Sequence, residues 1–280
     1  MYEILKKLEL APKIKLFDVS APEIARKAKA GQFVVFRVDE KGERIPLTIV
    51  DWDTKKGTIT LIFLEVGVST IKLGRLEVGD KILNLVGPLG NPSEIENYGT
   101  LAVVCGGVGT AAAYPIAKAL KNAGNKIVSI VGARTEETLV LEKEMEAVSD
   151  ELFVSTDDGT KGHKGYVSDV LVMLVEKGYK FDVVYAIGPS MMMRATANVT
   201  KKYSLKTIVS LNPIMVDGMG MCGACRVTVG GETKFACVDG PEFDAALVDF
   251  DELIQRLCVF KSQEKQALCS CKNSGDKKHV

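Results

Sequence analysis

The stretch TLAVVCGGVGTAAAYPIA, residues 100–117, carries the clearest fold signal in this chain of 280 residues. It is nearly uncharged and long enough to cross a membrane, but three glycines interrupt its middle and a proline lies near its end. Glycine-rich turns and proline break a continuous membrane helix. We therefore interpret the stretch as a buried strand, a tight turn and the start of a helix.

Beyond this stretch, apolar strands alternate with amphipathic helices. Helices are expected at 110–122, 136–147, 167–177 and 190–203, and an apolar run precedes each of them. Such alternation builds a parallel sheet whose strands are joined by helical crossovers. The pattern therefore predicts a doubly wound α/β domain over residues 99–210.

On either side of this domain the pattern changes. Residues 1–98 carry short β-type runs, such as QFVVFRV and TITLIFLEV, with little helical pattern between them, and these predict a small antiparallel β-barrel. Residues 211–280 contain short strands, glycines, cysteines and one amphipathic stretch, DFDELIQRLCVF, before a polar end, CSCKNSGDKKHV, that we expect to be mobile. No repeat or low-complexity linker separates the three parts, so we expect them to pack as one body.

The composition argues against several classes of protein. The 36 basic and 36 acidic residues are spread along the chain, so neither nucleic-acid binding nor attraction to a membrane surface is expected. The N-terminal sequence MYEILKKLELAP lacks the features of a signal peptide, which predicts a cytoplasmic protein without disulfides. Two histidines exclude a histidine-rich metal centre, whereas seven cysteines indicate metal ligation or redox work where they cluster.

The loop after residue 104 is the first candidate binding site. Its glycines let the backbone turn sharply and let a diphosphate approach the N–H groups of a helix start. Glycine, polar or charged residues also follow the next strands at the same predicted sheet edge, where open parallel sheets bind ligands. Each feature also has a plainer interpretation. The glycine loop would be only a tight turn, the arginine a solvated side chain, the aspartates part of a turn, and the methionines packing residues of a helix. The candidate nucleotide contacts are Gly106, Gly107, Val108, Gly109, Arg134, Asp157, Asp158, Gly188, Pro189 and Met191.

Two segments of the predicted barrel also carry candidate binding residues. The segment ERIPLTIVD places Arg44, Pro46 and Thr48 in one strand, which the proline restricts to an edge or an irregular position. The segment EVGVSTIKL places Gly67 before a helix start at Ser69, where N–H groups and hydroxyls suit a phosphate. Each segment alone has a plainer explanation, a surface arginine or a helix N-cap.

A barrel with these two segments, followed by a sheet with a GGVG loop, resembles the ferredoxin–NADP reductase family of flavoproteins over residues 1 to about 205. The resemblance implies that the barrel binds FAD and that the second domain delivers a nicotinamide. Thr48 would lie beside the reactive nitrogen of the flavin as the catalytic residue, with Leu47 against the ring. The arginine of the family pattern falls on Ile45 here, with Arg44 one place earlier. The implied FAD contacts are Arg44, Pro46, Leu47, Thr48, Ile62, Leu64, Gly67, Ser69 and Thr70.

Three cysteines form a ligand-like pattern in VDGMGMCGACRVTVGGETKFAC, residues 216–237. Two residues separate Cys222 from Cys225, and Cys237 follows after eleven more. Plant-type [2Fe–2S] ferredoxins use C-x4-C-x2-C and a distant cysteine, and the first position of that pattern falls here on Asp217. The glycines of the loop would let it wrap a cluster. A structural zinc site is the alternative, because zinc also accepts three cysteines and one carboxylate.

A flavin reductase body followed by this segment resembles the electron-transfer subunit of dihydroorotate dehydrogenase B, in which the first ligand is a cysteine. Asp217 in its place is more similar to the small subunit of NADH-dependent ferredoxin–NADP oxidoreductases, which bifurcate electrons. Related heterodimers have been described as sulfide dehydrogenases. The resemblance implies electron transfer between NAD(H), FAD and a [2Fe–2S] domain at 211–280, and a heterodimer with a larger flavin and iron–sulfur subunit.

A rival class stays open on the residues alone. A zinc-stabilised nucleotide-binding module without redox activity would show the same cysteines and the same glycine loop. NAD is preferred to NADP through the family resemblance alone, because Arg134 also suits a 2′-phosphate.

Overall fold

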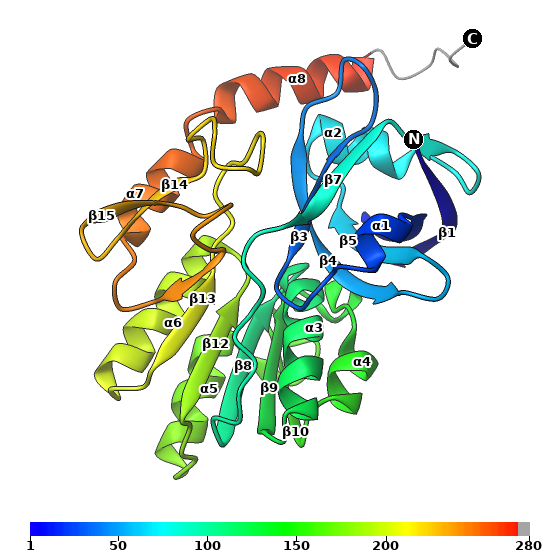
Figure 1. Cartoon of the computed structure of the whole chain (residues 1–280). Coiled ribbons are helices and arrows are strands. Elements are labelled where there is room, and N and C mark those ends of the chain that lie inside the picture. The colour runs from blue at the N-terminus through cyan, green and yellow to red at the C-terminus, as the bar shows by residue number, and fades with distance from the viewer. Residues whose placement is uncertain (274–280) are drawn as a thin grey trace.

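The N-terminal strands close into a nearly continuous antiparallel barrel sheet, in the order β6-β1-β2-β5-β4-β3-β7 (Figure 1). This computed structural model describes residues 1–273. The interior of the barrel is filled by alternate side chains, among them Phe17, Phe36 and Phe63, which are all buried. The elements of this part are β1 (Tyr2–Ala11), β2 (Ile14–Ser20), α1 (Pro22–Ala25), β3 (Phe33–Arg37), β4 (Ile45–Asp53), β5 (Thr58–Leu64), α2 (Val68–Gly74), β6 (Lys81–Ile82) and β7 (Asn84–Leu89).

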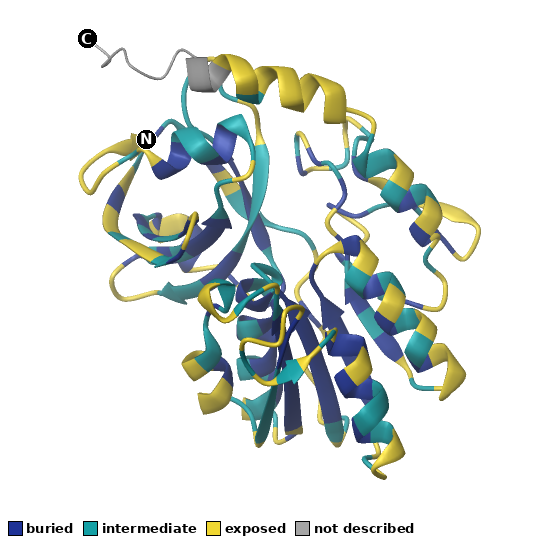
Figure 2. Ribbon diagram, turned by 180° about the vertical axis from the view of Figure 1, so that it is seen from behind, coloured by how far each residue is buried: buried dark blue, intermediate teal, exposed yellow. Residues whose placement is uncertain are grey.

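The second sheet has the order β11-β10-β9-β8-β12-β13-β16 and is parallel from β11 to β13. Helices α3 and α4 cover one face and α5 and α6 the other, so the central strands are buried on both sides (Figures 1 and 2). The chain runs from β8 outward to β10 and then crosses to β12. The topological switch point therefore lies between β8 and β12, which is where such sheets bind ligands. The elements are β8 (Thr100–Gly106), α3 (Gly109–Asn122), β9 (Lys126–Ala133), η1 (Glu136–Thr138), α4 (Glu142–Ala147), β10 (Glu151–Thr156), β11 (His163–Lys164), α5 (Val167–Glu176), β12 (Val183–Ile187), α6 (Ser190–Lys202) and β13 (Thr207–Ser210).

The helix expected at 136–147 is interrupted, and this prediction was wrong in its middle. A short 3₁₀ turn, η1, ends at Thr138, and Leu141 adopts a left-handed conformation with φ of 56° before α4 begins. Val140, between them, is 3% exposed and packs in a hydrophobic cluster that includes side chains of the barrel. Burial of Val140 against the barrel therefore outweighs continuation of the helix.

The C-terminal region is tied into the second sheet. Strands β14 (Arg226–Val229) and β15 (Glu232–Phe235) form a hairpin, while β16 (Glu242–Asp244) pairs antiparallel with β13. The predicted boundary near residue 210 thus divides strands of one sheet. Helix α7 (Phe250–Leu257) follows as the amphipathic stretch predicts.

A last helix, α8 (Lys261–Asn273), extends from the C-terminal region toward α2 of the barrel (Figure 1). The side chains of residues 261–270 are nearly all exposed (Figure 2). The polar end was expected to be mobile, but it is helical through Asn273, and the remaining residues 274–280 lie outside the described part. Within residues 1–273, no helix combines the length and the apolar character needed to cross a membrane.

Candidate functional site

The glycine loop turns at the carboxyl end of β8 and leads directly into α3. Gly107 has a φ of +57°, and no atom lies within 4 Å of the position that a Cβ would occupy there. A Cβ on Gly109 would instead lie 2.6 Å from the Cα of Gly188 and 2.7 Å from the carbonyl oxygen of Ile187. One glycine therefore leaves backbone open to a ligand, and the other lets α3 pack against the end of β12, as a dinucleotide fold requires.

The first turn of α3 adds a polar group to this loop. The Thr110 hydroxyl is buried and has no hydrogen-bond partner among the described residues. Cys105, just before the loop, is also buried, and this burial raises the pKa of its thiol to about 12. We therefore assign Cys105 a packing role. The Thr110 hydroxyl lies beside this thiol and, without a geometric hydrogen-bond partner, fits a nearby phosphate or ribose.

The other predicted nucleotide contacts differ in their surroundings. Arg134 and Asp157 are exposed at the rim of the sheet. Asp158 accepts hydrogen bonds from the backbone N–H of Thr160 at 3.0 Å and from its hydroxyl at 2.7 Å, and these lower the pKa of its carboxyl. Asp158 thus makes the turn that was the plainer alternative, while a role in binding stays a prediction.

The start of α6 forms the opposite wall of the switch point. Pro189 is the residue before the helix, and the buried Ser190 hydroxyl donates to Asn212 at 3.1 Å. Met191 is 55% exposed, whereas Met192 lies beside Gly106 of the loop and Gly188 after β12. The sequence could not separate these neighbours, because all three methionines of the run fit the helical pattern.

The strand β4 has a free edge where the flavin is predicted to bind. Pro46, opposite Val35, pairs only with β3, because the pairing of β4 with β5 begins at Ile49. The local edge expected from the proline is present, although β4 is an inner strand of the sheet. Residues 45–48, including Leu47 and Thr48, are all half-buried, and Arg44 is exposed. This half-buried, unpaired edge fits a flat ring held along β4.

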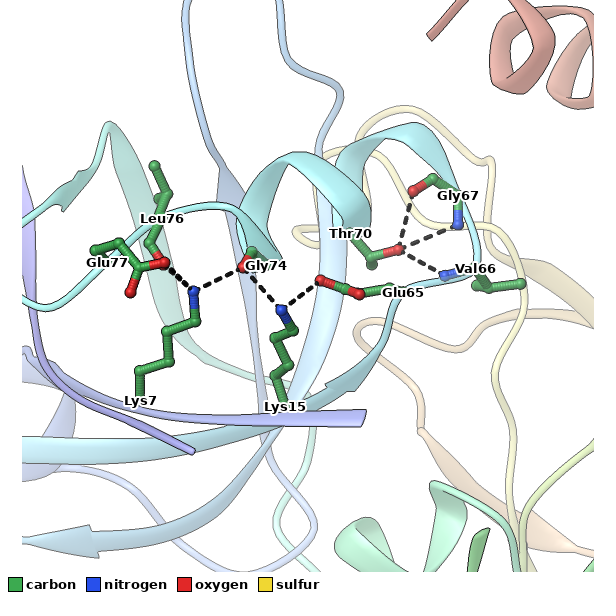
Figure 3. Close-up of polar contacts among 9 residues, drawn as sticks. All are labelled: Lys7, Lys15, Glu65, Val66, Gly67, Thr70, Gly74, Leu76 and Glu77. Atoms are coloured by element: carbon green, nitrogen blue, oxygen red, sulfur yellow. Dashed lines mark hydrogen bonds and ion pairs between the residues drawn. The ribbon is translucent and has the colours of Figure 1, made fainter. Parts of the chain in front are cut away.

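The start of α2 is built by two hydroxyls with different partners. The Thr70 hydroxyl accepts from the N–H groups of Val66 and Gly67 and donates to the Gly67 carbonyl, all at 3.1 Å (Figure 3). Ser69 donates to the Glu43 carboxylate at 2.9 Å, a partner that the sequence analysis missed. No atom lies within 4 Å of a Cβ position on Gly67, so the backbone before α2 is open. The assignment of Ser69 and Thr70 to a diphosphate stays a prediction.

The other end of α2 is fixed from the barrel wall. Lys7 and Lys15 donate to the carbonyl of Gly74 at 3.0 and 3.2 Å, and Lys15 also pairs with Glu65 at 3.1 Å (Figure 3). Cations are favourable beside the carbonyls at the end of a helix. The helix is thus held at both ends.

Three of the predicted cofactor contacts lie in the interface between the two domains. Ile62, at 4% exposure, belongs to the hydrophobic cluster that joins the barrel to the second sheet, and Leu64 and Val108 pack against that cluster. Their contribution in this structure is to hold the domains together.

The cysteine loop places two thiols side by side. The sulfurs of Cys225 and Cys237 are 3.2 Å apart and buried, while Cys222 is exposed. The Asp217 carboxylate accepts from the N–H groups of Met219 at 2.8 Å and Cys222 at 2.7 Å. Among the described residues, no three acidic, histidine or cysteine side chains converge to hold a metal ion.

These residues nevertheless fit a cluster in their chemistry. Glycines at 218, 220 and 223 all have positive φ, so the loop can curl and direct N–H groups inward. Three thiols and one carboxylate also match the donors that iron or zinc accepts. The ligand set Asp217, Cys222, Cys225 and Cys237 stays a prediction.

The cysteine loop lies directly against the barrel. A Cβ on Gly218 would lie 2.7 Å from Leu89 Cδ1 and 2.9 Å from Val35 Cγ2, so only glycine allows this approach. Asp217 and Arg44 line a common cavity of about 180 Å³ at this boundary. The predicted cluster site and the predicted flavin site are therefore neighbours.

A half-buried carboxyl joins all three parts of the chain and was not found from the sequence. Glu242 of β16 accepts from the Ser93 hydroxyl at 2.5 Å, and the Ser93 N–H donates to Ala30 of the barrel at 2.9 Å. Glu94, Tyr98 and Tyr185 surround this contact. Burial raises the pKa of Glu242 to about 6, the Ser93 bond opposes this shift, and the Glu94 charge adds to it.

Known proteins resemble each part of this chain. The sequence model of the iron–sulfur cluster binding domain of dihydroorotate dehydrogenase B matches residues 212–249, and that of the oxidoreductase NAD-binding domain matches residues 103–198. The dihydroorotate dehydrogenase B (NAD(+)) electron transfer subunit homolog of Thermotoga maritima is 51% identical over 94% of this chain and 93% of its own. The dihydroorotate dehydrogenase B (NAD(+)) electron transfer subunit of Bacillus caldolyticus is 37% identical over 78% of this chain and 86% of its own.

Solved structures agree with these relatives. A chain of an NADH-dependent reduced ferredoxin–NADP oxidoreductase, studied for flavin-based electron bifurcation, is 49% identical with a TM-score of 0.91, and 96% of each chain is covered. A ferredoxin–NADP reductase of Neisseria gonorrhoeae with bound FAD and NADP shares the fold alone, at 18% identity and a TM-score of 0.56 over 72% of this chain and 90% of that one. The family expected from the residues is confirmed: the chain belongs to the electron transfer subunits of the dihydroorotate dehydrogenase B family, built on the ferredoxin–NADP reductase fold.

Proposed function

We propose that this chain is the electron-transfer subunit of a heterodimer that carries electrons between NAD(H), FAD and a [2Fe–2S] cluster, in NADH-dependent ferredoxin–NADP oxidoreduction. The approach of Gly218 to Val35 and Leu89 carries the proposal, because it brings the cysteine loop against β3, the strand that pairs with Pro46 of β4. Electron transfer needs neighbouring redox groups, and a merely structural zinc site has no such requirement. A cytoplasmic location belongs to the proposal, because the clustered cysteines need a reducing compartment.

The residues of the chain would divide the work. Gly107 would expose backbone N–H groups to the dinucleotide, and β4 would hold the flavin along its free edge through Pro46, Leu47 and Thr48. Bound FAD would accept hydride from a nicotinamide and release electrons singly. The hydrophobic cluster around Ile62 would exclude water between the two domains. The loop would hold the cluster through Cys222, Cys225 and Cys237, with Asp217 as the fourth ligand.

The assignment of Asp217 favours the bifurcating branch of the family over dihydroorotate oxidation. A carboxylate is a harder ligand than a thiolate and alters the charge and hydrogen bonding of a cluster, which set its potential. We expect Asp217→Cys to retain the cluster and to shift its midpoint potential. A redox titration followed by electron paramagnetic resonance measures this shift, and an unchanged potential would remove Asp217 from the ligand set.

The function itself is tested on the complex purified with its natural partner. We expect flavin absorption, iron and sulfide in the preparation, and NADH-dependent bleaching of both centres. A colourless protein that contains zinc and no iron would contradict the proposal. Dihydroorotate oxidation is the second candidate, which the name of the Thermotoga maritima relative favours. A copurifying dihydroorotate dehydrogenase, or reduction of the complex by dihydroorotate, would establish that alternative, and reduction by sulfide would indicate a sulfide dehydrogenase.

A further inference from the structure

The switch point between β8 and β12 is flanked by two glycines, and one side chain lies over both. A Cβ on Gly106 would lie 2.7 Å from the sulfur of Met192, and a Cβ on Gly188 would lie 3.0 Å from both the sulfur and the methyl carbon of Met192. The two glycines end adjacent strands, because β8 and β12 are paired. The thioether of Met192 therefore covers the point where a ligand enters an open parallel sheet.

Only the middle methionine of the run MMM occupies this place. Met193 is fully buried in the core, and Met191 is 55% exposed with its sulfur 3.6 Å from Arg194 Nη2. Met192 is half-buried in the first turn of α6, so its side chain has contact with the sheet on one side and space on the other.

We propose that Met192 is a gate residue that controls entry of the dinucleotide to the switch point, an inference that rests on the proposed function. The position cannot hold both the thioether and a dinucleotide in contact with Gly106 and Gly188. Methionine suits a gate because three rotatable bonds and no branching let it leave a contact at low cost. The free protein thus populates a closed and an open arrangement, and only the open arrangement binds.

This model predicts opposite effects of two substitutions. Met192→Ala removes the side chain that must be displaced, so the dissociation constant should fall, on the order of fivefold, through faster association. Met192→Ile keeps the bulk but fixes χ1, because a β-branched side chain in a helix has one strongly preferred rotamer. The isoleucine variant should bind several-fold more weakly.

The matched control is Met173→Ala. Met173 is also half-buried and packs against the same face of the sheet, but it lies near the C-terminal end of α5. Its truncation should cost similar stability and leave dinucleotide binding unchanged. This control separates a gate from a general loosening of the fold.

The experiment uses oxidised holoenzyme complex, with NAD⁺ and NADP⁺ as probes so that no hydride is transferred. Calorimetry gives the dissociation constants, stopped-flow measurement gives the association and dissociation rates, and thermal unfolding gives the stability of each variant. Faster association and unchanged dissociation for Met192→Ala support the gate. Unchanged or weaker binding by Met192→Ala, or tighter binding by Met192→Ile, would overturn it. A wild-type complex that binds neither probe would instead contradict the proposed function, and the gate with it.

Discussion

Replacement of Glu242 by Gln tests whether the junction of the three parts responds to pH. The carboxyl lies 2.5 Å from the Ser93 hydroxyl and faces Glu94, Tyr98 and Tyr185. Glutamine keeps the size of the side chain and can still accept the Ser93 hydrogen bond, but it carries no titrating proton. The two proteins therefore differ in the charge that forms on Glu242 above its pKa.

The sign and size follow from the pKa, which rises from 4.5 to about 6 on folding. Between these values the folded protein binds more protons than the unfolded chain, so stability falls as pH rises. The contribution of Glu242 is complete below pH 4.5 and is lost once pH passes about 6. A pKa change of one pH unit corresponds to about 1.36 kcal/mol, so a change of this size gives a loss of about 2 kcal/mol in the free energy of unfolding.

Urea unfolding of wild type and Glu242→Gln at a series of pH values between 4.5 and 7.5 measures this contribution. The stability of wild type relative to the variant should fall by about 2 kcal/mol across that range, mostly below pH 6.5. Ser93→Ala removes the hydrogen bond that opposes the shift, so its pH transition should move upward. A stability difference between wild type and Glu242→Gln that is the same at every pH would refute the reasoning.

Two further substitutions test the nucleotide loop and the start of α2. Gly109→Ala would place a Cβ 2.6 Å from the Cα of Gly188, a backbone atom that cannot move aside as a flexible side chain can. We therefore expect the free energy of unfolding in urea to fall by about 1–3 kcal/mol. Calorimetry should also show weaker NAD⁺ binding. Equal stability of this variant would show that α3 can move. Thr70→Ala removes the hydroxyl that accepts hydrogen bonds from the N–H groups of Val66 and Gly67, so the free energy of unfolding should fall by about 1 kcal/mol. FAD should also be lost more easily on dialysis. Thr70→Ser, which retains the hydroxyl, is the control. Equal flavin retention in the alanine variant would separate the cap from the cofactor site.

Local patterns predicted most of the second sheet, because strand and helix periods differ. Helices α3, α5 and α6 begin within one residue of the expected positions, whereas α4 begins six residues late, at Glu142. The first strand of the barrel was missed. Residues 2–11 bury only Ile4 and Ala11, so the run lacks the alternation that marks a half-buried strand. Pairing with β2 and β6 holds it in place, and such distant partners leave no mark in the run itself.

The sequence predicted those parts of the candidate site where the local backbone geometry suits a single residue type. Gly107 and Gly109 were identified as loop glycines, and the structure separates their roles by the space around each. Glu242 and its partner Ser93 are 149 positions apart, so no local pattern could join them. Met192 could not be distinguished from its neighbours. Successive side chains of a helix point to different faces, but which face meets the end of the sheet is known only once the helix is packed.

The position of the cysteine loop depends on both folded domains at once. Strand β16 ties the C-terminal region to β13 of the second sheet, and Gly218 ties the loop to β3 and β7 of the barrel. A change in the angle between the barrel and the sheet must therefore displace the loop from one of them. Glu242 lies on β16 and reaches the barrel through Ser93, so the contact for which we predict a pH response also ties the sheet to the barrel. The distance between the predicted flavin and cluster sites is thus set by tertiary packing, and the spacing of cysteines in the sequence carries no information about it.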